Sequence, residues 1–336
     1  MKVPKIRQLP SGAWTCQLRL DGKSISITDP DPDVVLAKAY AYKGGVLDAR
    51  RAPDNITVGQ ALERYLDARQ NVCSPATMRG YRGMQDNRFK HLQTLRLGAL
   101  SKAVLQREIN AEAALVSPKT LQNAYSLFSS AMREAGYEPP NITLKQVPPS
   151  DPLFLEPDQI KTLMAAVVGS RDEVPILLAL LSCRRSEIYG LDWADVDMDR
   201  RQIKIRQAVV LNENNTPVTK AMPKNSTSVR IIPIIDQLYS ALERETARRG
   251  RVVTGNPNNL YDRVNTICRR AGLPEVGVHG LRHSFASLAY HLHIPEKIAM
   301  QLGGWSNDQV MKRIYTHLAQ QDINNAAESL INFFNC

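Results

Sequence analysis

Two short runs near the N-terminus alternate between hydrophobic and polar residues, which is the pattern of a half-buried β-strand. They cover Trp14–Leu20 and residues 24–28, and the Asp21-Gly22 dipeptide between them favours a tight hairpin turn. A helix is expected next, at about residues 34–47. Residues 1–51 are therefore predicted to form a small three-stranded β-sheet with one helix.

Residues 55–137 show the spacing of hydrophobic residues that is typical of helices. Thr57 can cap the first helix of this segment. Ser74-Pro75 and Ser117-Pro118 each combine an N-cap serine with a proline at the first helical position, which is a strong start signal. We expect four helices here, the last of them ending near Gly136.

Proline-containing linkers divide the chain into three parts. Residues 50–54 form the first linker, and proline pairs within 138–149 hold the second one extended. Beyond it, the pattern predicts helices at 157–168, 173–182 and 184–191, strands at 202–211 and 228–234, and helices to the end. The sequence thus predicts a multidomain α+β protein with domains at 1–51, 55–145 and 152–336, the last being mainly helical with a small β-sheet.

The charge of the chain favours a polyanionic partner. Lysine and arginine number 43 against 33 acidic residues, which gives a net charge of +10 and a pI near 9.4. A basic three-stranded sheet of this size can enter a DNA groove, although a solvated hairpin explains the same residues equally well. The candidate DNA contacts lie on that sheet and on the second helix of the helical region, and they are Lys5, Arg7, Arg19, Lys23, Arg79, Arg82, Arg88 and Lys90.

Composition excludes several other classes of protein. The hydrophobic content of 43% with 23% charged residues is that of a globular chain rather than a disordered one. No apolar run approaches the roughly 20 residues that span a bilayer, and the N-terminus lacks the apolar centre of a signal peptide. The five cysteines are widely spaced and never form C-x-x-C, so we expect a reducing compartment, no disulfide framework and no metal site.

Two polar groups in the third domain contain candidate chemistry that also has an ordinary structural explanation. Arg184 and Glu187 are three residues apart, so they share a helix face and can form an ion pair. The segment from Lys220 to Pro233 predicts a polar turn that leads into a strand, and a lysine at such a turn is usually solvated.

Two further groups follow along the chain. His279 and Arg282 repeat the spacing of three, which places an imidazole and a guanidinium on one side of a helix. A zinc site with His283 is disfavoured, since the H-E-x-x-H motif would require a glutamate where Gly280 stands. The last group is Gly-Gly-Trp at 303–305, with a tyrosine ten residues after the tryptophan.

Taken in order, these four groups resemble the tyrosine recombinase, or phage integrase, family. The resemblance rests on R-x-x-E from Arg184, a lysine followed at variable spacing by S-x-R-x-x-P ending at Pro233, H-x-x-R from His279, and G-G-W followed by Tyr315. It covers essentially all of residues 152–320. The helical region is similar to the family's core-site-binding domain, and the N-terminal sheet resembles the arm-type DNA-binding domain of phage and conjugative-transposon integrases.

The resemblance implies a metal-free and cofactor-free mechanism. A tyrosine attacks a phosphodiester, cationic donors stabilise the charge that builds on the phosphate, and a lysine protonates the leaving 5′-hydroxyl. Arginine suits this work because its planar fork binds two phosphate oxygens and stays charged. The implied residues are Tyr315 as the nucleophile, Arg184, Arg282, His279 and Trp305 as phosphate donors, Lys224 as the general acid, and Glu187 as the residue that orients the catalytic helix and the neighbouring basic groups.

The chain departs from the family pattern at several positions. Lys220 is the alternative to Lys224, because the length of the hairpin varies. The family often has Thr-Gly before the first arginine, where this chain has Ser182-Cys183. Gly304 stands where a Leu-Gly-His version has its histidine, and the spacing from Trp305 to the tyrosine is one residue longer than the commonest one.

The resemblance also implies partners and a location. The chain is expected to act in the bacterial cytoplasm, at the nucleoid, on double-stranded DNA that carries core and arm sites. A homotetramer on the DNA is implied, with a host DNA-bending protein and an excision factor as accessory partners. The apolar C-terminal stretch, residues 322–336, is expected to pack either within its own chain or on a neighbouring copy.

Three functions remain open from the sequence. An integrase that inserts and excises a prophage or mobile element explains two separate DNA-binding regions upstream of the third domain. A type IB topoisomerase shares the same chemistry but would not need residues 1–51. The third is a non-catalytic regulator derived from an integrase. It is disfavoured because such a protein would not need to keep all the polar residues that the resemblance assigns to catalysis.

Overall fold

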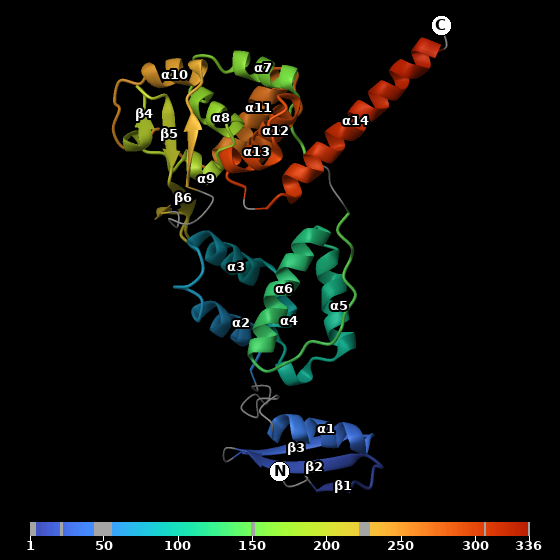
Figure 1. The fold of residues 1–336 in the computed structure, drawn as a ribbon. Coiled ribbons are helices and arrows are strands. Elements are labelled where there is room, and N and C mark those ends of the chain that lie inside the picture. Colours follow the sequence, from blue (N-terminus) through green and yellow to red (C-terminus); the bar gives the residue numbers. More distant parts are fainter. Residues whose placement is uncertain are drawn as a thin grey trace. The chain divides into compact units, whose positions relative to one another are not determined.

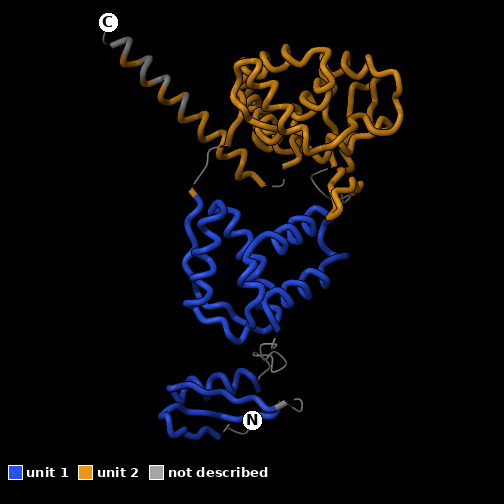
Figure 2. The backbone as a smooth tube through the Cα atoms, turned by 180° about the vertical axis from the view of Figure 1, so that it is seen from behind, with its two compact units in different colours: residues 1–147 blue, residues 148–336 orange. Residues whose placement is uncertain are grey.

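The computed structural model describes residues 5–20, 23–43, 56–148, 152–221, 229–305 and 307–334. The chain forms two compact units, residues 1–147 and residues 148–336 (Figure 2). The first unit contains two separate hydrophobic clusters, one in the N-terminal sheet and one in the helical region. The proposed boundaries of three domains stay a prediction.

The N-terminal part is a three-stranded antiparallel sheet in the order β1-β2-β3, and helix α1 lies against it (Figure 1). Its elements are β1 (Ile6–Gln8), β2 (Trp14–Leu20), β3 (Lys23–Asp29) and α1 (Pro32–Lys43). Cys16, Leu18 and Ile27 project from the strands into a core shared with Val35 and Ala39 of the helix. The alternating pattern therefore predicted both the hairpin and its buried face. Residues 44–47 of the predicted helix lie outside the described residues.

The middle of the chain is helical, as the sequence predicted. It contains α2 (Val58–Asp67), α3 (Pro75–Asn87), α4 (Lys90–Thr94), a 3-10 turn at Leu97–Ala99, α5 (Lys102–Ala113) and α6 (Pro118–Glu134). The three predicted caps are present: the Thr57, Ser74 and Ser117 hydroxyls accept the backbone N–H groups three residues on.

The helical region differs from the prediction in two respects: it has five α-helices where four were expected, and the basic second helix is shorter. Helix α3 ends at Asn87, so Arg88 and Lys90 do not belong to it. Phe89 takes a left-handed conformation with φ of 49°, because its ring is buried against Phe128 at 5.2 Å between ring centroids. The Phe89 backbone N–H then donates to the buried carboxylate of Glu112 at 2.9 Å, which compensates for the broken helix.

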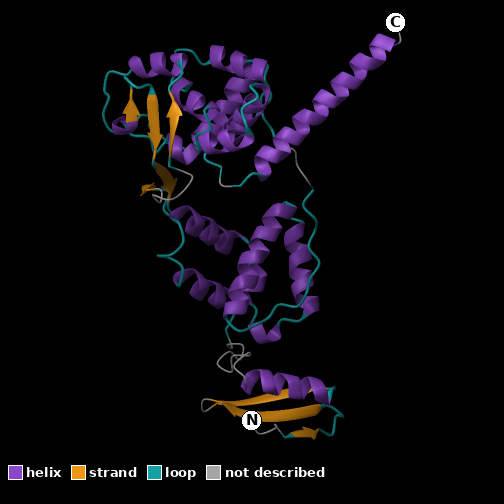
Figure 3. Ribbon diagram, in the orientation of Figure 1, coloured by secondary structure: helices purple, strands orange, loops and turns teal. Residues whose placement is uncertain are grey.

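The second unit is mainly helical and has two small sheets (Figure 3). Its helices are α7 (Pro157–Ala166), α8 (Glu173–Leu180), α9 (Arg185–Ile188), a 3-10 turn at Trp193–Asp195, α10 (Asp236–Glu243), α11 (Asn259–Arg270), α12 (Gly277–His291), α13 (Glu296–Gly303) and α14 (Gln309–Phe334). Helix α8 is buried on nearly all sides and forms the centre of the core. None of the described helices is both long and apolar enough to cross a membrane.

One strand prediction needs correction. The predicted strand 202–211 is two strands, β5 (Gln202–Ile205) and β6 (Gln207–Leu211), which belong to different sheets. Strand β5 pairs with β4 (Val196–Asp197) and β8 (Arg230–Pro233), whereas β6 pairs with β7 (Pro217–Ala221). The break falls at Arg206, whose side chain is held by the buried carboxylate of Asp195. Alternation alone does not reveal such a change of partner.

The predicted helix 184–191 is also shorter than expected. Helix α9 ends at Ile188, and the chain then turns close to β6. A side chain at Gly190 would place its Cβ 2.7 Å from the Cα of Ala208, so only glycine allows this approach. The close approach ties the α9 segment to the β6–β7 hairpin.

Candidate active site

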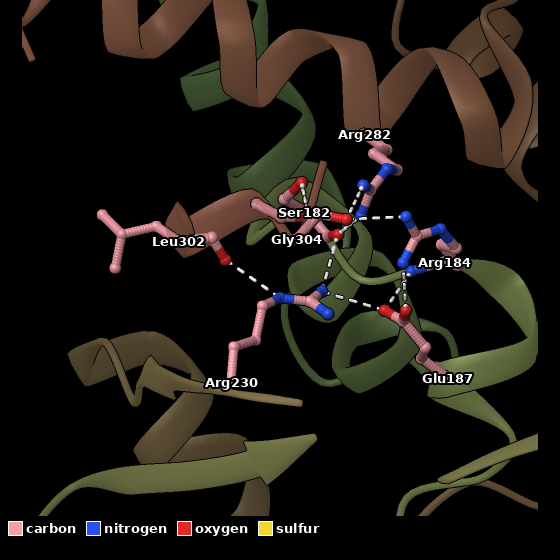
Figure 4. Close-up of polar contacts among 8 residues, drawn as sticks. Ser182, Arg184, Glu187, Arg230, Arg282, Leu302 and Gly304 are labelled. Atoms are coloured by element: carbon pink, nitrogen blue, oxygen red, sulfur yellow. Dashed lines mark hydrogen bonds and ion pairs between the residues drawn. The ribbon is translucent and has the colours of Figure 1, made fainter. Parts of the chain in front are cut away.

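Arg184 and Glu187 lie at the start of α9 (Figure 4). After α8 the chain turns at Ser182, whose φ is 68°, and Arg184 becomes the N-cap residue of α9. Its backbone N–H donates to Glu187 Oε2 at 2.9 Å, and its Nη1 donates to Glu187 Oε1 at 2.6 Å. The predicted ion pair is therefore present, but as a reciprocal cap at a helix start instead of a pair on a helix face.

Arg282 of α12 reaches the same place from a distant part of the chain (Figure 4). Its Nη1 donates to the carbonyl oxygen of Ser182, and its Nη2 donates to the Gly304 carbonyl oxygen at 3.4 Å. The Gly304 oxygen also accepts a hydrogen bond from Arg184 Nη2 at 2.6 Å. The two predicted phosphate-binding arginines are therefore adjacent and share one acceptor.

Arg230 is a third arginine in this cluster, and sequence reasoning did not assign it a role. It lies on β8 with its side chain only 4% exposed, and its Nη2 donates to Glu187 Oε2 at 2.9 Å. The alternation of β8 contained a signal for it, because Arg230 lies on the same buried face as Ile232. A charged residue in the position of a core residue indicates a buried partner.

The cluster has more positive than negative charge. Arg184, Arg230 and Arg282 surround a single buried carboxylate, that of Glu187. Burial and the charge of Arg184 lower the pKa of Arg282 to about 9. Burial opposes ionisation of Glu187, but hydrogen bonding to Arg230 and Arg184 brings its pKa below the ordinary value, so it stays charged. The excess charge suits an anion such as a phosphodiester.

Cys183, next to the first arginine, does not take part in this chemistry as a nucleophile. Its side chain is fully buried, and burial raises the pKa of its thiol to about 12. It is a small core residue of the second unit.

His279 lies one turn before Arg282 on α12, with its ring 6.4 Å from that of His283. Burial lowers the pKa of His279, and the charges of Arg282, Arg185 and Arg184 lower it further, so the neutral imidazole is favoured. Burial also lowers the pKa of His283. Among the described residues, no group of three or more histidine, cysteine or acidic side chains is placed to hold a metal ion.

Trp305 contacts Arg282 directly. The Arg282 Cζ lies 4.6 Å from the centroid of the indole ring, within cation–π distance, and the ring of Phe285 packs on the indole at 5.9 Å. Gly303 permits this arrangement, because a Cβ there would lie 2.2 Å from the indole ring. The structure thus brings Trp305 to the arginine cluster.

Tyr315 lies on α14 and packs against the apolar cluster that contains Trp305. Its ring meets that of Tyr290 edge-on at 5.3 Å. Burial, and then the charge of Glu296, raise the pKa of Tyr315. Its buried hydroxyl has no hydrogen-bond partner in the described part of the chain, an unfavourable state that a polar substrate group can relieve.

The two candidate lysines lie on either side of the end of β7. Lys224 lies within residues 222–228, outside the described residues. Lys220 is exposed on β7, where it pairs with Ala208 of β6.

The predicted DNA contacts fall into two groups. Arg82 donates to Glu63 at 2.7 Å and to Asp67 at 3.0 Å, and Arg88 donates to Glu112 at 3.3 Å, so both are held by carboxylates of the same unit. The second group is exposed and consists of Lys5, Arg7, Arg19, Arg79 and Lys90. The side chain of Lys23 lies outside the described part of the chain.

Comparison with protein families and curated proteins gives consistent matches. Residues 153–322 match the model of the phage integrase family. The chain is 25% identical to a XerC-like tyrosine recombinase of Caldanaerobacter subterraneus subsp. tengcongensis, with 89% of each sequence covered. It is 27% identical to a putative prophage phiRv2 integrase of Mycobacterium tuberculosis, with 86% of this chain and 84% of the relative covered.

Solved structures show the same fold at low sequence identity. The Tn1549 transposon integrase in complex with transposon right end DNA matches with a TM-score of 0.64 at 17% identity, over 81% of this chain and 100% of that one. A lambda integrase dimer bound to a core site matches with a TM-score of 0.59 at 16% identity, over 93% of this chain and 94% of that one.

Proposed function

Because the chain belongs to the phage integrase family and is a site-specific tyrosine recombinase acting on DNA, we propose that it integrates and excises a mobile element through a covalent 3′-phosphotyrosine intermediate. The observation that carries the proposal is the pair Arg184 and Arg282, adjacent in a cluster with excess positive charge. Such a cluster can stabilise the negative charge of a phosphorane-like transition state, where each well-placed donor is worth roughly 3–4 kcal/mol.

In the proposed cleavage step the Tyr315 hydroxyl gives up its proton to water as its oxygen attacks the scissile phosphorus. The bond from tyrosine to phosphorus forms as the bond to the 5′-oxygen breaks, and Lys224, or Lys220 in its place, protonates the leaving oxygen. His279, kept neutral by its surroundings, donates one N–H to the phosphate. The phosphotyrosine preserves the energy of the broken linkage, so rejoining needs no nucleotide cofactor.

Two further residues complete the proposed site. The indole N–H of Trp305 can donate to a phosphate oxygen but cannot transfer a proton at neutral pH. Glu187 orients Arg184 through the backbone and side-chain hydrogen bonds described above. The exposed basic residues of the first unit, with Arg79 and Arg7 as examples, are proposed to contact DNA phosphates.

A suicide-substrate experiment tests the chemistry. The protein is incubated with a nicked duplex that carries the attachment core of its own element, in the presence of EDTA, and covalent adducts are resolved on a denaturing gel. Wild type and Tyr290→Phe, a matched control in which the neighbouring tyrosine loses its bond to Asp322, should form the adduct. Tyr315→Phe should form none. Specific DNA binding by the wild type without any adduct would instead support the non-catalytic regulator.

We also propose that four copies assemble on DNA through the C-terminal helix. Beyond Leu318, which is buried, α14 exposes Ile323, Leu330 and Ile331, each of them more than half exposed. Apolar side chains on an uncovered helix favour a partner surface. A chain truncated after Gln321 should bind core DNA but fail to form tetramers in gel filtration. Unchanged tetramers would contradict this assignment. The host DNA-bending protein and the excision factor remain predictions.

A further inference from the structure

Arg230 joins four separate parts of the second unit (Figure 4). From β8 its Nη2 donates to Glu187 Oε2 at 2.9 Å and to the Ser182 carbonyl oxygen at 3.0 Å. Its Nε donates to the carbonyl oxygen of Leu302, at the end of α13, at 2.9 Å. Its guanidinium also lies against Gly304, where an added Cβ would approach Arg230 Nη1 to 2.8 Å. One buried side chain thus bridges β8, the segment before α9, α9 and the turn after α13.

Two of the acceptors of Arg230 are shared with residues that we propose to bind the phosphate. Glu187 Oε2 accepts from Arg230 and from the backbone N–H of Arg184, while its Oε1 accepts from Arg184 Nη1. The Ser182 carbonyl oxygen accepts from both Arg230 and Arg282. The orientation of both phosphate-binding arginines therefore depends on acceptors that Arg230 holds in place.

The position of Arg230 in the chain adds a second consequence. Residues 222–228, which contain Lys224, lie between β7 and β8, and Arg230 is the first residue of β8. The contacts of Arg230 therefore fix the point where the chain leaves the lysine-bearing segment, relative to Arg184 and Arg282.

We propose that Arg230 is a positioning residue, which aligns Arg184 and Arg282 through Glu187 and Ser182 and fixes the start of β8 relative to them. It does not touch the substrate. This inference rests on the proposed function, in which the two arginines bind the scissile phosphate. A misplacement of about 1 Å in such a site can reduce the rate by about 100-fold.

The test compares Arg230→Met with Arg230→Lys and with a matched control, Arg263→Met. Arg263 forms a similar ion pair in the same unit, at 2.8 Å from the largely buried Asp172, and within the described part of the chain it does not bond to Glu187 or Ser182. Each variant is assayed for thermal unfolding, for DNA affinity and for the single-turnover rate of adduct formation on saturating nicked duplex. Arg230→Met should lose about 100-fold or more in rate while DNA affinity changes less than about threefold. Under conditions where it is folded to the same extent as the wild type, Arg263→Met should cleave the duplex at nearly the wild-type rate.

A pH profile separates positioning from a general loss of stability. Arg230 is one of two cations that keep the Glu187 carboxylate ionised, so Arg230→Met should move the acidic limb of the rate profile to higher pH. Arg230→Lys should restore that limb, because it restores the charge, but only part of the rate, because it lacks the planar fork. Arg263→Met should leave the limb unmoved. A rate for Arg230→Met within about threefold of wild type, or an equal loss in Arg263→Met, would overturn the proposal.

A measurement that needs no cleavage distinguishes this proposal from the proposed function. In the intact protein, the side-chain N–H signals of Arg184 and Arg282 in nitrogen-15 NMR report whether the guanidinium groups are held. These signals should broaden or shift in Arg230→Met and stay unchanged in Arg263→Met. If they respond in this way but the wild type forms no adduct, the positioning role stands and the recombinase mechanism fails. If Arg230→Met leaves both signals unchanged, the positioning role is wrong.

Discussion

Replacing Gly304 by alanine should disable the site through a single added carbon. Gly304 ends α13 with a φ of 63°, a left-handed conformation that costs an ordinary residue roughly 1–2 kcal/mol. The added Cβ would lie 2.8 Å from Arg230 Nη1, 3.0 Å from its Cζ and 3.1 Å from its Cδ. These three atoms span the end of the side chain, so the whole guanidinium must move away from its acceptors.

The size of the expected loss of stability follows from the ion pair that a displaced Arg230 would break. Its ion pair with Glu187 is buried on both sides, and breaking a buried pair costs about 3–5 kcal/mol. Gly272→Ala is the matched control, because Gly272 has a φ of 70° in the same unit but no atom within 4 Å of an added Cβ. Both variants share the backbone strain and the stiffer unfolded chain, so the difference between them isolates the displaced arginine.

Two assays measure that difference. Urea unfolding followed by circular dichroism should show that Gly304→Ala loses about 3–5 kcal/mol more stability than Gly272→Ala. Adduct formation on the nicked duplex, measured where both variants are folded, should be slowed only in Gly304→Ala. Equal losses of stability in the two variants, or a wild-type rate of adduct formation in Gly304→Ala, would refute the reasoning.

Three further predictions concern other parts of the chain. An NMR titration should place the pKa of His279 below the ordinary 6.5. Because the unfolded chain then binds a proton more readily than the folded site, the free energy of unfolding should fall as the pH drops below about 6.5. This fall should be less steep in His279→Asn, and an unchanged slope in that variant would contradict the reasoning. Ser74→Ala removes the cap on the Thr77 N–H and should cost about 1 kcal/mol in urea unfolding, whereas no loss would mean that the cap is replaced by water. Lys224→Ala should cleave slowly on ordinary DNA and recover on DNA with a 5′-thiol leaving group, which needs no proton, and recovery in Lys220→Ala instead would reverse the assignment.

The sequence by itself determined the features that depend on neighbours along the chain. The alternation of Trp14–Leu20 predicted a strand with one buried face, and Ser74 and Ser117 marked helix starts, because a cap bonds to a backbone group only three residues away. The order and spacing of the four polar groups indicated the family, which the match over residues 153–322 confirmed. The role of each residue and the choice between Lys224 and Lys220 stay predictions.

Tertiary structure decided what depends on partners far away in the sequence. Helix α3 ends before Phe89 because that ring packs on Phe128. The predicted strand 202–211 divides because its two halves pair with different strands. Arg230 is buried only because Ser182, Glu187 and Leu302, 48, 43 and 72 residues away, supply its acceptors. Periodicity detects which face of an element is apolar, but the acceptors that compensate a buried charge come from elements that only folding brings together.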